Sequence, residues 1–160
     1  MTNNIIIFIH LIAAAIAIGS MVFSIILLLP STDKVPAQQE LEEFSIPYKT
    51  VELLAPTVFT CLLILIGTGI YYLLENYTGQ MALKPGYYNL FGLKLICVVV
   101  AFFLSIYQTF NLRARIANLD LSPENRKIVP KTIQQIKKTT IPVLVTFSLA
   151  LFFGIWLARF

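Results

Sequence analysis

The two residues best suited to chemistry are His10 and Lys94. His10, the single histidine of the chain, lies in an apolar run at 5–29, and Lys94 lies in a second run at 90–110. Ionisable side chains inside a membrane span are costly and commonly mark functional sites. A neutral imidazole is also a frequent metal ligand and axial haem ligand. Both residues are therefore candidate site residues.

The elements that must position these residues are four apolar runs. The chain has 160 residues, of which 58% are hydrophobic and 12% charged, whereas soluble domains are about a quarter charged. The runs lie at about 5–29, 54–74, 90–110 and 141–158. Each is close to the roughly 20 residues that cross a bilayer as a helix. We predict an all-α transmembrane four-helix bundle that forms a single membrane domain over 1–160.

The first run is predicted to be retained as a helix. It is longer than the usual apolar core of a signal peptide, and no basic segment precedes it.

The basic residues predict the orientation of this bundle. The connection 111–140 carries seven of the twelve Lys and Arg residues, and such residues mark cytoplasmic loops. Both termini are then on the outer, periplasmic side of a bacterial inner membrane. Membrane lipid is an expected partner, because anionic headgroups attract basic loops. The net charge of +4 needs no nucleic acid to explain it.

Helix direction places the candidate residues at one level. His10 lies about five residues below the outer start of its span, or roughly 8 Å, and Lys94 about four residues below, or roughly 6 Å. Tyr71 of the second span reaches the same level from the opposite direction. We therefore predict His10, Lys94 and Tyr71 as cofactor-binding residues. Two other interpretations stay open: Lys94 extends to the headgroups, or His10 only makes an interhelical hydrogen bond.

The helix face that carries His10 is predicted to line the bundle interior. At helical spacing it holds mostly small residues, which let membrane helices approach closely. These residues are Ala13, Ala14, Ala17, Met21 and Ser24.

The supply of ligands favours haem over copper at His10. One histidine cannot provide bis-histidine ligation, and Met21 lies roughly 16 Å away along the helix. A copper site built from this chain is therefore short of ligands. Cys61 and Cys97 form no Cys-x-x-Cys pair, so we expect them to pack as small apolar residues. Proton transfer through His10 is a further option that needs no metal.

Two segments resemble a known superfamily of membrane proteins. The sequence FIHLIAAAIAIGSMVFSIILLLP at 8–30 resembles the first helix of copper resistance protein D-like domains and of HemJ-type protoporphyrinogen oxidases. The sequence GLKLICVVVAFFLSIYQ at 92–108 resembles their later helix, which carries a lysine near its outer end.

The resemblance implies specific roles for the two candidate residues. His10 would be the metal ligand, binding haem b axially, and Lys94 would act as a catalytic residue near the propionates or as a ligand. The chain lacks the arginine that follows Leu29-Pro30 in the HemJ-type family and the Arg-Asn-Glu signature of the fourth helix. The resemblance therefore implies the broader haem- or copper-associated superfamily ahead of the oxidase activity itself.

These observations predict an integral membrane protein with an intramembrane histidine site. We expect it to bind haem b and to serve redox chemistry or electron transfer. One alternative is a non-catalytic accessory subunit of a larger respiratory or photosynthetic membrane complex. The expected protein partners are such a complex or further copies of this chain. A second alternative is a copper-handling membrane protein.

Overall fold

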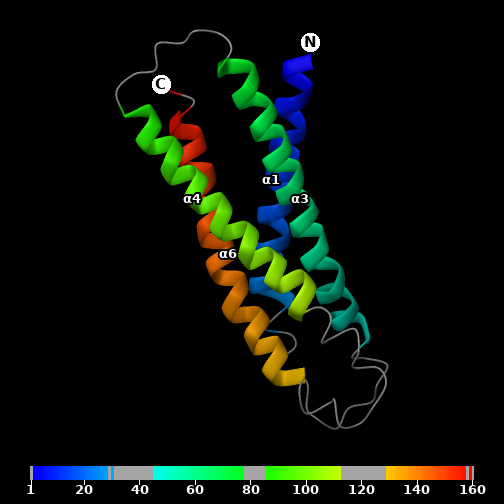
Figure 1. Cartoon of the computed structure of the whole chain (residues 1–160). Helices are drawn as coiled ribbons and strands as arrows, with labels where there is room; N and C mark the ends of the chain where they lie inside the picture. The colour runs from blue at the N-terminus through cyan, green and yellow to red at the C-terminus, as the bar shows by residue number, and fades with distance from the viewer. Residues whose placement is uncertain are drawn as a thin grey trace.

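The computed structural model of the chain describes residues 2–28, 30, 45–77, 86–112, 129–157 and 159. These residues form four long helices and no strand (Figure 1), which confirms the predicted all-α four-helix fold. The helices are α1 (Thr2–Phe23), α3 (Ser45–Tyr77), α4 (Tyr87–Ile106) and α6 (Val129–Leu157). Short π-helical segments, η1 (Ser24–Leu28) and η2 (Tyr107–Leu112), continue α1 and α4.

Each long helix contains a stretch that is long and apolar enough to cross a membrane. The four stretches are Asn4–Leu27, Leu53–Glu75, Tyr87–Leu112 and Gln134–Leu157. They overlap all four predicted spans, so the protein is a multi-pass membrane protein. Both chain termini lie at one end of the bundle (Figure 1), which we call the terminal end. The side of the membrane that this end faces stays a prediction.

Two helices begin earlier than the apolar runs predicted. The sequence placed the fourth helix at 141–158, but α6 begins at Val129 and passes through Pro142. Likewise, α3 begins at Ser45 and passes through Pro56. A proline removes one backbone hydrogen bond, but neighbouring side chains make this tolerable in membrane helices. The predicted basic connection 111–140 is accordingly shorter, and most of it lies outside the described residues.

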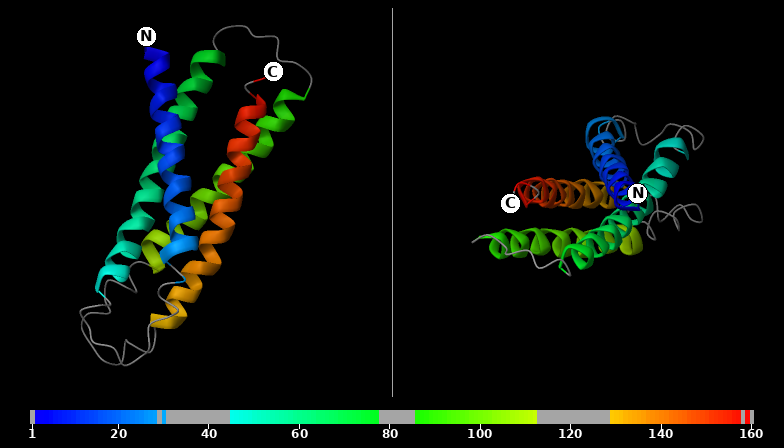
Figure 2. Two further views of the ribbon diagram at one scale, coloured as in Figure 1. Left: turned by 180° about the vertical axis from the view of Figure 1, so that it is seen from behind. Right: turned by 90° about the horizontal axis from the view of Figure 1, so that it is seen from above.

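The helices are arranged as two tightly packed pairs. α1 packs mainly against α3, and α4 packs mainly against α6, with fewer contacts between the pairs. The pairs lie close together in the lower part of the bundle and separate towards the terminal end (Figures 1 and 2).

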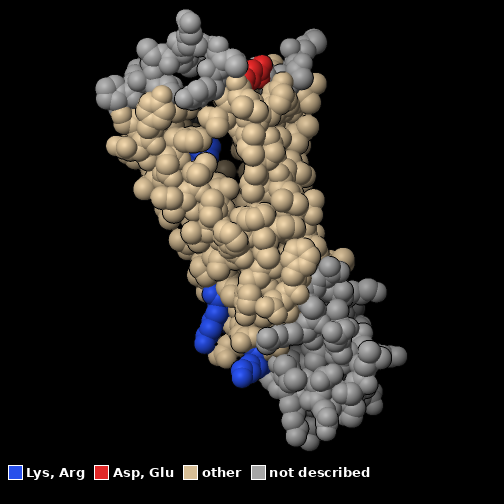
Figure 3. All heavy atoms as spheres, in the orientation of Figure 1, with Lys and Arg blue, Asp and Glu red and all other residues tan. Residues whose placement is uncertain are grey.

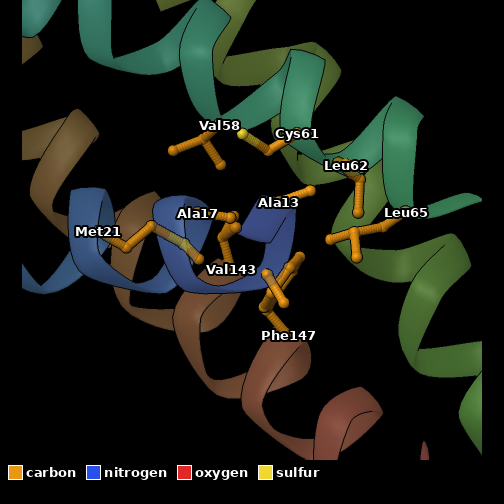
Figure 4. Packing of buried hydrophobic residues seen from close by; sticks show 10 residues of the cluster. Ala13, Ala17, Met21, Val58, Cys61, Leu62, Leu65, Val143 and Phe147 are labelled. Carbon is orange, nitrogen blue, oxygen red and sulfur yellow. The ribbon is translucent and has the colours of Figure 1, made fainter. Parts of the chain in front are cut away.

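The buried core occupies the part of the bundle where the pairs meet. Ala13, Ala17, Val58, Val143 and Phe147 converge there from α1, α3 and α6 (Figure 4). The residues predicted to share the interior face with His10 are buried. They have exposures of 6% or less, and they are Ala13, Ala14, Ala17 and Met21 of α1 and Ser24 of η1.

Burial ends part-way along each of the four helices. Among the described residues, none is buried closer to the terminal end than Ala13 on α1, Leu65 on α3, Ala101 on α4 and Ala150 on α6. The half of the bundle nearer the chain termini therefore has no fully packed interior of its own.

A polar cluster joins η2, the continuation of α4, to α6 at the other end of the bundle. The amide nitrogen of Gln108 donates hydrogen bonds to the hydroxyls of Thr139, at 3.0 Å, and Thr140, at 2.8 Å. Both hydroxyls donate in turn to backbone carbonyls of α6. One helical turn away, the Ser105 hydroxyl is buried and has no hydrogen-bond partner among the residues that the structure describes. Within that part of the chain, Gln108 makes interhelical hydrogen bonds and Ser105 does not.

Replacing Gln108 with alanine is expected to lower the free energy of unfolding by about 1 kcal/mol, since two interhelical hydrogen bonds of roughly 0.6 kcal/mol each are lost. The matched control is Ser105→Ala, which removes a buried hydroxyl that has no partner among the described residues. That change is expected to leave stability unchanged or raise it. Reversible unfolding in mixed micelles measures both effects. Equal destabilisation by the two variants would contradict the prediction.

Candidate functional site

His10 lies on α1 one helical turn above the last buried residue, Ala13, towards the terminal end. Its ring is partly buried. Its Nδ1 atom is 2.6 Å from the hydroxyl oxygen of Thr68 on α3. The hydrogen bond ties α1 to α3 directly above the core, and it restrains the orientation of the ring.

The surroundings of Thr68 indicate which ring nitrogen carries the proton. A threonine hydroxyl has one proton to donate, and this one lies 2.7 Å from the carbonyl oxygen of Ile64 and 3.2 Å from that of Leu65. A threonine in a helix commonly donates to such a carbonyl. Because the hydroxyl proton of Thr68 is used in that bond, Nδ1–H of His10 donates to the hydroxyl oxygen of Thr68. The other ring nitrogen, Nε2, then carries the lone pair that can bind a metal.

Lys94 lies on α4 and extends towards α6. Its side chain is partly buried. A β-carbon placed on Gly154 of α6 would lie 3.4 Å from the Lys94 Nζ atom and 3.6 Å from its Cε atom. The ammonium group therefore sits against the bare backbone of α6, within the α4–α6 pair.

His10 and Lys94 belong to opposite helix pairs. Among the described residues, no hydrogen bond joins them, and no carboxylate forms an ion pair with Lys94. Both lie above the packed core, where the pairs separate. Figure 3 shows a hollow on this face near the terminal end, with a basic side chain visible inside it. The bundle above the core therefore carries an imidazole on one helix pair and an ammonium group on the other.

Tyr71, the third predicted site residue, is 43% exposed on α3. It makes no hydrogen bond with His10, whose described partner is Thr68. Its predicted role in binding a cofactor stays a prediction. The residue that the prediction missed, Thr68, precedes Tyr71 by three positions, so it lies on the same face of α3, nearly one turn further from the terminal end. The sequence did contain a signal for Thr68, since it places a hydroxyl on the polar face of the second span at about the depth of His10.

Aromatic side chains surround the terminal end of the α4–α6 pair. Tyr88 and Trp156 are largely exposed, as expected for residues at the headgroup level. A shallow apolar depression of about 280 Å³ lies beside them, lined by Gly86, Asn89, Leu90, Leu93 and Trp156. It does not include His10 or Lys94.

The described residues contain no group of three or more His, Cys, Asp or Glu side chains that could hold a metal ion. Cys61 is buried and Cys97 partly buried, and both are free thiols. His10 is thus a lone imidazole donor among the described residues, and one imidazole is a ligand that haem can take from a protein. A copper site takes several protein ligands.

Comparisons of the chain with protein-family models, curated proteins and solved structures found no match. The resemblance to the copper resistance protein D-like and HemJ-type superfamily stays a prediction that depends on the two quoted segments.

Proposed function

We propose that this membrane protein binds haem b through Nε2 of His10 and uses it in redox chemistry or electron transfer. The main support is the hydrogen bond between His10 Nδ1 and Thr68. Histidines that bind metals almost always donate their other ring N–H to a fixed acceptor, which sets the tautomer and the ring orientation. His10 has such an acceptor.

Three features of the chain would each contribute to such a haem site. Thr68 holds the His10 ring, and the apolar core below Ala13 keeps water away from one side. Lys94 supplies a positive charge that can pair with a propionate, which offsets the cost of holding an ammonium group in a low dielectric. Haem with a histidine ligand supplies one-electron chemistry.

The optical spectrum of the purified protein tests this proposal. Protein from haem-replete cells is expected to show a Soret band and to contain one haem per chain. Apoprotein prepared without haem should bind added haemin with the same stoichiometry. A colourless protein that also fails to take up haemin would overturn the proposal.

Replacing Thr68 with valine is expected to weaken haem binding by roughly tenfold, the usual lower limit for losing the partner of a metal-bound histidine. Valine keeps the shape of threonine but cannot accept the Nδ1 proton. The matched control is Thr60→Val on the same helix, because the Thr60 hydroxyl bonds only to the carbonyl of Pro56 among the described residues. Haemin titrations of the two variants measure the difference, and equal affinities would contradict the role given to Thr68.

A second candidate function is an accessory subunit of a larger membrane complex. It is favoured by the terminal half of α4, where no described residue before Ala101 is buried. A helix of a partner protein could cover that face. This function predicts co-purification with large partners at a fixed stoichiometry after mild solubilisation. A solitary, stable oligomer would argue against it.

A further inference from the structure

The position of Lys94 needs a physical explanation. A lysine near the end of a membrane span normally extends its flexible side chain towards the headgroups and water. Lys94 instead runs sideways within the α4–α6 pair, with Nζ and Cε over Gly154. It remains partly buried there. Something at this point of α6 must accommodate the ammonium group.

Gly154 differs from the other glycines that the structure describes. A β-carbon placed on Gly19, Gly67, Gly69 or Gly92 would meet nothing within 4 Å. Only Gly154, of the six described, has a neighbour within that distance, and the neighbour is Lys94. The space next to the α6 backbone is therefore occupied by the lysine side chain.

The location on α6 also suits a cation. Gly154 lies in the last turn of α6, which ends at Leu157. The carbonyl groups of a last turn lack partners within the helix, and together they carry the negative end of the helix dipole. Without a side chain at position 154, an ammonium group can approach this backbone closely. The helix end thus provides a partial counter-charge where no described carboxylate does.

We propose that Gly154 is a positioning residue that holds the Lys94 ammonium group inside the bundle. The glycine gap and the end of α6 keep the cation between α4 and α6, where it is not extended into water. The inference extends the proposed haem site, in which Lys94 pairs with a propionate. That pairing rests on the proposed function. The placement of Lys94 itself can be tested without haem.

Chemical labelling of lysine tests this placement. A water-soluble amine reagent should modify Lys94 much more slowly than the exposed Lys131 in purified wild-type protein. Gly154→Leu places a branched side chain where Nζ lies, and it should raise the labelling rate of Lys94 by about fivefold or more, since the displaced side chain can reach water. Gly154→Ala should change little, because its β-carbon would be at ordinary contact distance.

The control is Gly67→Leu, the same change at an exposed glycine that faces open space. It should leave labelling of Lys94 unchanged. If Gly154→Leu does not fold, the double variant Lys94→Ala/Gly154→Leu is expected to fold, because truncating the lysine vacates the space that leucine needs. An unchanged Lys94 rate in folded Gly154→Leu, or failure of the double variant to restore folding, would overturn the inference. Lysine labelling and folding can be measured without haem. If the protein binds no haem, these measurements still test the placement of Lys94.

Discussion

Purified His10→Gly protein is expected to lose nearly all of the haem absorbance of the wild type. The chain contains no other histidine, so no second imidazole can replace the lost ligand. The substitution also leaves a space bounded by Thr68, whose hydroxyl still bonds to the α3 backbone. Because that space has the shape of an imidazole ring, added imidazole should restore the Soret band.

Recovery by imidazole separates loss of the ligand from loss of the fold. A misfolded variant would not respond to the small molecule. Lys94→Ala is the companion variant: it should bind haem more weakly, but the Soret band should stay at the wild-type wavelength if His10 alone binds the iron. A His10→Gly protein that keeps its haem would contradict the assignment of His10.

The fold was largely predictable because hydropathy alone decides which segments enter a membrane. All four predicted spans are present, and the small residues on the His10 face of α1 are buried as expected. The helix starts at Ser45 and Val129 were missed because the residues just before both apolar runs include polar and charged side chains. Hydropathy marks the part of a helix that enters the membrane, and it gives no signal where the helix continues beyond that part.

The candidate site was predictable only in part. The depth of His10 and Lys94 follows from counting residues along helices of known direction. Their contacts do not, because helix rotation and pairing depend on how side chains pack. Each residue therefore contacts the other helix of its own pair: Lys94 lies against Gly154 of α6, and His10 is hydrogen-bonded to Thr68 of α3. The separation of the pairs towards the terminal end (Figure 2) has no counterpart in the hydropathy pattern.

Ala17→Leu is expected to cause a large loss of stability. Ala17 is 0% exposed and lies in the core with Val58 and Val143 (Figure 4). In membranes, helices associate largely through close packing, since lipid tails are as apolar as the side chains. Three extra carbons at this point must push α1 away from its neighbours, at a cost of about 1–3 kcal/mol or more for overpacking a core.

The matched control for this change lies two residues earlier on the same helix. Ala15 is exposed on the opposite face of α1, so leucine there should meet lipid or detergent without a clash. Unfolding curves for Ala15→Leu should therefore overlay those of the wild type, while Ala17→Leu unfolds much more readily. Because His10 lies less than two turns from Ala17, displacement of α1 should also lengthen the His10–Thr68 contact and lower haemin affinity. Stability loss in both variants, or in neither, would contradict the packing that positions the site.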